Sequence, residues 1–285
     1  ITNQDGLRGL LVNVIEKTDE QGTSLKVYLS YTPTDGALYY AQWAEGFRLG
    51  NVNLKMPASC DVDGNGILDG TDAPIKDGFD SDTTENFELG AKLTLLDNRL
   101  QVNTALYQVN WDGLPIFVFS GSPCFRGLTV NAGEARSRGF EIETNYQVTE
   151  SLRINLGGAY TNAELTQDAA GVGVSGDRLT SSPEYNVNFG LLYEFDLGGN
   201  PSYVSGDYAY VGEFFNRVGE TGVETGDYGQ LNMSAGVALN SFNVEFYVHN
   251  LTDENALTYA DTVIRDDRAY RLRPRTIGLN VGYQF

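Results

Sequence analysis

The final nine residues of the chain, Ile277 to Phe285, read I-G-L-N-V-G-Y-Q-F and alternate strictly between two kinds of side chain. Odd-numbered positions are apolar or aromatic, and even-numbered positions are Gly, Asn or Gln. Because successive side chains of a β-strand point to opposite faces, this pattern predicts a strand with one apolar and one polar face. A soluble sandwich strand has the same pattern, but this one stops at the carboxyl terminus on an aromatic residue. The combination is typical of the closing strand of an outer-membrane β-barrel.

The same alternation recurs along most of the chain, in runs of about 9–13 residues that suit a tilted strand crossing a bilayer. Strands of soluble sheets are shorter, usually about 5–6 residues. The clearest stretches are Phe87–Leu95, Phe140–Tyr146, Leu152–Tyr160, Tyr185–Phe195, Leu231–Leu239 and Phe242–Val248. No apolar run approaches the ~18 residues of a membrane helix, so a helical membrane protein is excluded.

The connections between these stretches alternate strictly between short and long. Tight turns are predicted at Thr32–Gly36, Leu96–Asn98, Val148–Ser151, Asp196–Pro201 and Asn240–Ser241. Long polar connections are predicted at Arg48–Thr83, Asp112–Glu134, Asn162–Ser182, Phe214–Asp227 and Asn250–Pro274. Outer-membrane barrels have tight turns on the periplasmic side and long loops outside the cell, which places this C-terminus in the periplasm. A soluble β-helix or large sandwich is the alternative, but neither requires five long loops at one end.

The predicted fold is therefore all-β, a transmembrane antiparallel up-and-down β-barrel with about twelve strands in this chain. Eleven strands are predicted from Ser24 onward, and a twelfth within Leu7–Lys17. The chain carries 33 Gly among 285 residues, above the roughly 7% of average proteins, as expected of a curved and crowded sheet. Its net charge of −19 argues against nucleic acid as a partner, because phosphates require a basic surface.

The strongest local motif is D-V-D-G-N-G-I-L-D-G-T-D at Asp61–Asp72, which matches a calcium-loop template. Gly66 stands at position six, where the loop turns sharply. The predicted Ca²⁺ ligands are the side chains of Asp61, Asp63, Asn65, Asp69 and Asp72 and the carbonyl of Ile67. Asp72 replaces the usual Glu and no flanking helices are apparent, so a solvated acidic loop with turn glycines is the alternative.

Cys60 and Cys124 fall in two successive long connections. They either form a disulfide that ties these loops together or remain as two separate thiols. An oxidising compartment favours the disulfide. His249 is the only histidine, so neither a His-based metal site nor a catalytic triad is available. Without a nucleophile elbow or a spaced acid–base pair, the sequence does not predict an enzyme.

The alternation also assigns residues to the two faces of the barrel. The predicted lipid-facing residues include Ile142, Val187, Phe189, Leu191, Leu279 and Val281. The predicted inward-facing residues include Glu141, Glu143, Asn188, Glu245 and Asn280. Arg271, Arg273 and Arg275 are predicted to contact lipopolysaccharide phosphates at the outer membrane boundary, unless Pro274 turns them inward.

Several stretches together resemble the C-terminal half of the barrel of TonB-dependent outer-membrane receptors. They are Tyr39–Arg48 (YYAQWAEGFR), Glu85–Gly90 (ENFELG), Asp97–Leu100 (DNRL), Val109–Gly113 (VNWDG), Asn131–Glu141 (NAGEARSRGFE), Gly157–Leu165 (GGAYTNAEL), Gly176–Pro183 (GDRLTSSP), Val248–Asp253 (VHNLTD) and Arg271–Phe285. The family barrel has twenty-two strands and is filled by an N-terminal plug that carries the TonB-contacting segment. Residues 1–285 would then be the C-terminal portion of such a barrel, without the plug.

The resemblance implies an active-transport receptor in the outer membrane of a Gram-negative bacterium, which captures a scarce small-molecule ligand such as a ferric siderophore. Its implied partners are the TonB energising complex, the outer-membrane assembly machinery, which reads Tyr283 and Phe285 as a signal, and lipopolysaccharide or membrane lipid. The barrel would be monomeric. Cobalamin, heme, a metal or an oligosaccharide are alternative ligands, heme being least supported because His249 stands alone. A passive channel and a structural or adhesion barrel are the alternative functions.

Overall fold

The computed structural model describes residues 23–131, 133–169, 171–220, 222–261 and 268–285. The strand predicted within Leu7–Lys17 lies outside these residues. One antiparallel sheet of eleven strands dominates the structure, and each strand pairs with the next in the order of the sequence. Its strands are β1 (Lys26–Thr34), β2 (Ala37–Arg48), β5 (Asp82–Leu95), β6 (Leu100–Asp112), β9 (Glu134–Gln147), β10 (Leu152–Leu165), β11 (Tyr185–Asp196), β12 (Pro201–Val211), β15 (Tyr228–Leu239), β16 (Phe242–His249) and β19 (Thr276–Tyr283). The prediction of eleven strands from Ser24 onward is confirmed.

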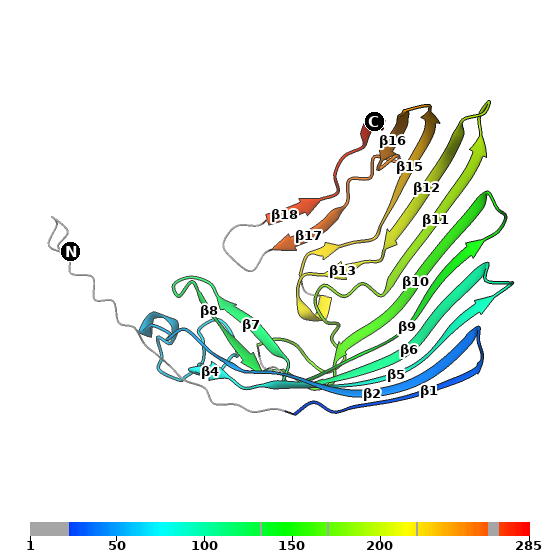
Figure 1. Ribbon diagram of the computed structural model, residues 1–285. Coiled ribbons are helices and arrows are strands. Elements are labelled where there is room, and N and C mark those ends of the chain that lie inside the picture. The colour runs from blue at the N-terminus through cyan, green and yellow to red at the C-terminus, as the bar shows by residue number, and fades with distance from the viewer. Residues whose placement is uncertain (1–22, 132, 170, 221, 262–267) are drawn as a thin grey trace.

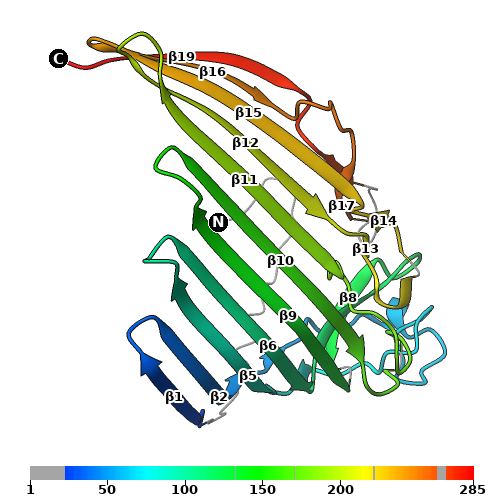
Figure 2. The same ribbon diagram turned by 90° about the vertical axis from the view of Figure 1, so that its right-hand side faces the viewer.

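The sheet curves into an open trough, with the long connections at one end and the tight turns at the other (Figures 1 and 2). No pairing joins β1 to β19 among the described residues, so the sheet is not closed into a barrel. The long connections contain short elements of their own. These are β3 (Asn51–Val52), η1 (Ala58–Cys60), β4 (Gly78–Phe79), β7 (Pro115–Ser120), β8 (Arg126–Asn131), β13 (Phe214–Phe215), η2 (Val218–Glu220), β14 (Glu224–Thr225), β17 (Leu257–Asp261) and β18 (Arg268–Arg271).

Among the described residues, no helix has both the length and the apolar character to span a membrane.

The strand register gives the sheet one apolar and one polar face. Leu279 lies opposite Phe246 on the neighbouring strand, whereas Asn280 lies opposite Glu245. In the centre of the sheet, Phe189 is paired with Leu156 on one side and Tyr208 on the other. Because directly paired residues share a face and neighbours along a strand do not, the predicted lipid-facing and inward-facing sets lie on opposite faces.

The buried core of the described residues lies mainly in the long connections, not in the sheet. On the apolar face of the sheet, Ile277 and Leu279 are 63% and 62% exposed. A soluble sandwich would cover such a face with a second sheet. An apolar face of this extent without a protein cover is the arrangement of a lipid-embedded barrel.

Glycines on the polar face lie beneath tyrosine rings from adjacent strands. The four pairs are Tyr40 over Gly90, Tyr107 over Gly139, Tyr203 over Gly236 and Tyr247 over Gly278. Two of these hydroxyls then reach carboxylates on the same face, since Tyr40 donates to Glu88 (2.6 Å) and Tyr203 donates to Glu245 (3.0 Å). The glycines therefore leave room for aromatic side chains that lie flat across the strands.

Replacing Gly139 with Ala is expected to destabilise the folded sheet by about 1–3 kcal/mol, as overpacking of a filled position does. The added methyl would overlap the backbone carbonyl of Tyr160 and the hydroxyl of Tyr107. Guanidinium unfolding of the detergent-solubilised protein measures the change. The matched control is Gly206→Ala, where the nearest atom to the new methyl lies 3.8 Å away. Equal midpoints for the two variants would contradict this packing role.

Candidate functional site

Three long connections pack together above one end of the sheet, and we call residues 49–81, 113–131, 166–169 and 171–182 the loop assembly. Its main hydrophobic cluster contains the buried residues Cys60, Leu68, Ala73, Val118, Cys124, Leu128 and Val130, with Met56, Ile75 and Val172 packed against them. A second cluster contains Leu114, Ala135, Leu165, Ala169 and Val218. The loop assembly is therefore a folded layer with its own core.

Polar contacts hold the connections of the loop assembly in fixed positions. The Asn53 side-chain amide donates to the Thr129 carbonyl, and its oxygen accepts from the Thr129 N–H, both at 2.8 Å. Asn131 makes the same two-way contact with the backbone of Asp80, at 2.8 and 3.0 Å. The Ser120 hydroxyl donates to the carbonyl of Asp69. Both strands of the hairpin β7–β8 are thus hydrogen-bonded to the connection formed by residues 49–81.

A disulfide joins the same two connections. Cys60, at the end of η1, and Cys124, in the turn between β7 and β8, are bonded with their Cα atoms 4.6 Å apart. Both residues lie in the main hydrophobic cluster. The two cysteines are 64 positions apart in the sequence, and β5 and β6 lie between them.

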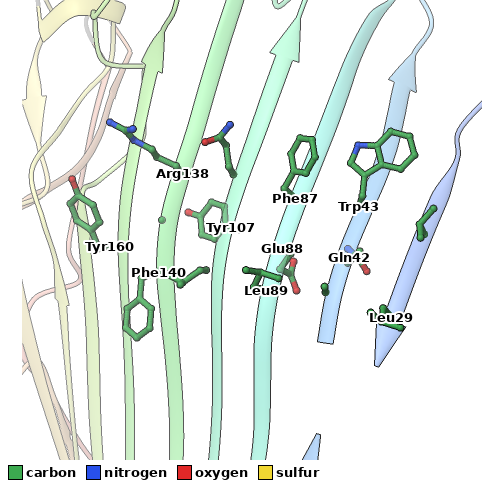
Figure 3. Close-up of a pocket in the computed structure, with 15 residues that line it drawn as sticks. Leu29, Gln42, Trp43, Phe87, Glu88, Leu89, Tyr107, Arg138, Phe140 and Tyr160 are labelled. Atoms are coloured by element: carbon green, nitrogen blue, oxygen red, sulfur yellow. The ribbon is translucent and has the colours of Figure 1, made fainter. Parts of the chain in front are cut away.

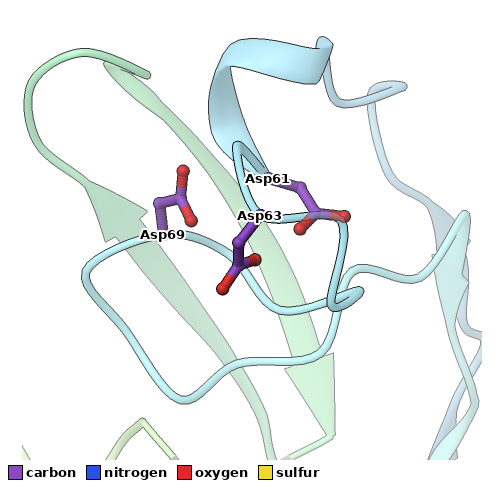
Figure 4. Close-up of side chains that lie close together, drawn as sticks. All are labelled: Asp61, Asp63 and Asp69. Atoms are coloured by element: carbon purple, nitrogen blue, oxygen red, sulfur yellow. The ribbon is translucent and has the colours of Figure 1, made fainter.

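Three of the predicted calcium ligands, which follow Cys60 in the sequence, lie close together (Figure 4). Carboxylate oxygens of Asp61, Asp63 and Asp69 lie within 4.8 Å of one another. Backbone N–H groups orient two of them, since Gly66 donates to Asp61 Oδ2 (3.1 Å) and Val62 donates to Asp69 Oδ2 (3.0 Å). Asp61 Oδ1 is shielded from solvent and has no hydrogen-bond partner. We call these three aspartates the acidic cluster.

The other predicted ligands are not part of the acidic cluster. The Asn65 side chain donates to Asp63 Oδ2 (2.9 Å) and accepts from the Ile67 N–H (2.7 Å). Asp72, predicted to close the loop at position twelve, is exposed and lies outside the group. The reason is a tight reversal of the chain, because the Leu68 N–H bonds the Ala73 carbonyl at 2.9 Å and both residues are fully buried. Burial of this pair turns Asp72 to the surface.

A charged group at the base of the loop assembly was not predicted from the sequence. Asp82, 4% exposed, accepts two hydrogen bonds from the Arg48 guanidinium (2.9 and 3.1 Å) and one from Trp111 Nε1 (2.6 Å). The same guanidinium lies 5.7 Å from the centroid of the Trp111 ring. Arg48 is the last residue of β2, Asp82 is the first residue of β5, and Trp111 is the second-last residue of β6. Their contacts therefore hold the three strands together at the level where the loops begin.

A family model described as the TonB dependent receptor-like β-barrel matches residues 2–251. The chain belongs to the TonB-dependent receptor family. Proteins of this family are outer-membrane β-barrels of Gram-negative bacteria. The family expectation drawn from the ordered sequence motifs is confirmed.

Among the similar TonB-dependent receptors is the metal-pseudopaline receptor CntO of Pseudomonas aeruginosa, 34% identical over 70% of this chain and 25% of its own length. The solved ferric yersiniabactin uptake receptor FyuA of Yersinia pestis has a TM-score of 0.73 at 21% identity, over 91% of this chain and 37% of that chain. The ferric preacinetobactin receptor BauA of Acinetobacter baumannii has a TM-score of 0.71 at 20% identity, over 96% and 38%. The chain thus spans about a quarter of the length of CntO.

The remaining predicted residues of this TonB-dependent receptor barrel lie at its two ends. Tyr283 and Phe285 are at the tight-turn end, where the Tyr283 ring contacts Phe242 (4.9 Å between centroids) and Phe285 (5.1 Å). His249 ends β16 at the opposite end, with its ring 4.9 Å from that of Tyr247. The role of Tyr283 and Phe285 in assembly stays a prediction.

The three arginines before the last strand lie in the connection between β16 and β19. Arg271 Nη1 donates to the Asn255 carbonyl (3.0 Å). Arg275 donates to the Leu251 carbonyl (3.2 Å) and lies 3.7 Å from an Asp253 carboxylate oxygen. The guanidinium groups of Arg271 and Arg275 therefore bind their own loop, and lipopolysaccharide contact by these arginines stays a prediction.

Proposed function

We propose that this chain is the C-terminal barrel portion of a receptor that captures a scarce extracellular ligand for TonB-energised uptake. The loop assembly carries the proposal, because a folded layer with its own core is a rigid surface on which a ligand can be recognised. The long loops would face outside the cell, and the C-terminus would face the periplasm. A passive channel is the alternative function.

The proposed ligand is a metal chelate, most specifically a ferric siderophore. The names of CntO, FyuA and BauA support this class, since each describes a receptor for a metal complex of a small organic molecule. The polar face of the sheet would line the lumen and meet a plug. The free edges of β1 and β19 would pair with the remaining strands of a twenty-two-stranded barrel, because an open sheet edge is not tolerated in lipid.

Deleting the gene for the intact receptor is expected to abolish uptake of its ligand from dilute solution. Radiolabelled ferric yersiniabactin, ferric preacinetobactin and pseudopaline–metal complexes serve as probes in iron-limited cells. Uptake of at least one probe should fall to the level of a strain without TonB, and the cloned gene should restore it. Uptake that persists without TonB would support the passive channel and overturn the proposal.

We also propose that the acidic cluster holds Ca²⁺ as a structural ion. Three carboxylates within 4.8 Å repel one another, and a hard divalent cation removes this repulsion by binding their oxygens. The unpartnered Asp61 Oδ1 supports the same assignment. The extracellular setting suits a weak site, with a Kd of about 10⁻⁴–10⁻³ M.

Chelation of Ca²⁺ is expected to increase protease cleavage within Asp61–Asp72 while leaving the barrel intact. Limited proteolysis with mass-spectrometric mapping of the cut sites measures the effect. Asp61→Asn combined with Asp63→Asn should give the chelated pattern even with Ca²⁺ present. Asp77→Asn, an exposed change in the same connection outside the acidic cluster, is the control and should respond like the wild type. Identical cleavage of the wild type with and without chelator would eliminate the calcium site.

A further inference from the structure

Cavities occur on both faces of the sheet. A groove of about 770 Å³ on the apolar face is lined mainly by apolar and aromatic side chains, among them Trp43, Leu89 and Phe140 (Figure 3). This face is predicted to meet lipid, so the groove offers no path to a hydrophilic molecule. The polar face carries two cavities, of about 290 and 380 Å³, over β12, β15, β16 and β19, and Glu245 and Asn280 line both. We call these two cavities together the polar groove.

The polar groove runs along the strands. Asp207 and His249 line it toward the long loops, and Asn243 and Gly282 line it toward the tight turns. On β16, His249 is six residues from Asn243, which corresponds to about 20 Å along a strand and about 15 Å across a membrane at a tilt near 40°. The apolar band of an outer-membrane barrel is about 25 Å tall, so the groove follows more than half of that height.

Hydrogen bonds join polar side chains of the polar groove to one another across the strands. The bonded pairs are Tyr203–Glu245 (3.0 Å), Asn280–Glu245 (2.9 Å), Ser205–Ser234 (2.8 Å) and Asn232–Asp207 (3.0 Å). Side chains that already have partners bind a passing polar molecule only weakly, and conduction requires weak binding at several positions of the surface that a molecule follows. This wall also keeps its hydrogen bonds whether or not another domain covers it.

The part of the polar face on β5 and β9 has a different character. Lys92, Glu141 and Glu143 are exposed there, and no ion pair joins any of the three to another described residue. Charges on the wall of a filled lumen need counter-charges from the domain that fills it, because an unpaired buried charge is costly. The β5–β9 wall therefore suits a fixed contact with a plug, and the wall of the polar groove does not depend on one.

The charge of the polar groove limits the molecule that fits it. Its lining includes the carboxylates of Glu194, Asp207 and Glu245, and no Lys or Arg occurs among the described residues that line it. Carboxylates without cations beside them repel an anionic molecule and attract a cationic one. The complementary molecule is therefore a hydrophilic metal chelate of neutral or positive net charge.

We propose that the metal chelate crosses the outer membrane along the polar groove, between the β12–β19 wall and the plug, and that its net charge is neutral or positive. The inference rests on the proposed transport function and adds to it a route and a ligand charge. The plug would stay in contact with the β5–β9 wall through its charges while the space along the polar groove opens.

Thiol labelling of the intact receptor in iron-limited cells tests the route. Ser234→Cys places a thiol in the polar groove, and Asn103→Cys is the control on β6, between Lys92 and Glu143 in the register. Radiolabelled ferric yersiniabactin, ferric preacinetobactin and pseudopaline–metal complexes are the chelates, and a hydrophilic maleimide is the reagent. During uptake, the labelling rate of Ser234→Cys should rise by about fivefold or more, because labelling follows the fraction of time for which the thiol is open to water. The rate for Asn103→Cys should not change.

The outcomes separate the route from the transport function. Chelate uptake without a rise at Ser234→Cys, or with an equal rise at both thiols, would overturn the route and leave the transport function standing. If the wild type takes up none of the three chelates in a TonB-dependent manner, the transport function itself fails, and the route with it.

Ser234→Lys and Ser234→Glu test the charge of the chelate, because they add long side chains of opposite charge at one position of the polar groove. Uptake is expressed relative to the chelate that cells without TonB bind, which accounts for the amount of receptor and for capture at the loops. Relative uptake should be about threefold or more lower in Ser234→Lys than in Ser234→Glu, since a like charge opposes the passage of a cationic chelate. Equal uptake, or the reverse order, would overturn the assignment of charge.

Discussion

Replacing Phe189 with Arg is expected to destabilise the membrane-embedded barrel by about 2–4 kcal/mol, the cost of a basic side chain on the lipid face near the midplane. Phe189 lies on β11 midway between Tyr185 and Tyr193, which are placed where the two aromatic girdles are expected. It is paired with Leu156 and Tyr208, so the neighbouring strands offer no carboxylate partner at this depth.

Asn188→Arg is the matched control, because it introduces the same side chain one position away on the opposite face. Asn188 is exposed on the polar face and lies over Gly157, so its replacement should cost less than about 1 kcal/mol. Reversible guanidinium unfolding in lipid vesicles measures both variants. A cost at Asn188 equal to that at Phe189 would contradict the assignment of the two faces.

The register refines the choice of position for this experiment. Val281 is also predicted to face lipid, but it is only two residues from Tyr283 at the tight-turn end of β19. The cost of a basic residue falls to about 0–1 kcal/mol near an interface. Val281→Arg should therefore cost less than Phe189→Arg.

The sheet was predictable because its signal is local. A strand between lipid and a polar lumen must alternate at every position, so Tyr185–Phe195 shows its length and its two faces in its own sequence. Strand ends were less predictable. A long connection was predicted to begin at Asn162, but β10 continues to Leu165, paired with Ala135 on β9. Beyond the membrane both faces are polar or covered by loops, and the alternation that marks a strand disappears.

The loop assembly could not be predicted, because its stability comes from contacts between distant segments. Nothing near Asn53 in the sequence indicates its pairing with Thr129, and Asp82 gains its partners from the ends of β2 and β6. The calcium template correctly brought three of its ligand positions together, at Asp61, Asp63 and Asp69. It misplaced Asp72, because a template of spacing does not include the burial of Leu68 and Ala73.

Replacing Cys60 and Cys124 together with Ser is expected to open the loop assembly while the barrel stays folded. A disulfide stabilises mainly by limiting the freedom of the opened chain. The strands β5 and β6 between the cysteines remain paired in the barrel, so only the loop segments on either side of them gain freedom. Closing roughly 30 such residues is worth about 3–4 kcal/mol in the chain-entropy estimate.

The loss should appear as protease cleavage in residues 49–81 and 113–131, with little change in the guanidinium midpoint of the barrel. Leu128→Ala in the same cluster is the comparison variant, because it removes about 2–5 kcal/mol of packing without releasing the covalent link. Added Ca²⁺ should reduce cleavage more in the cysteine variant than in the Leu128→Ala variant. The reason is that the acidic cluster begins at Asp61, next to Cys60, so a bound ion would hold the segment that the broken disulfide releases. A cysteine variant as resistant as the wild type would show that the hydrophobic cluster alone holds the loops, and the disulfide would then have no stabilising role.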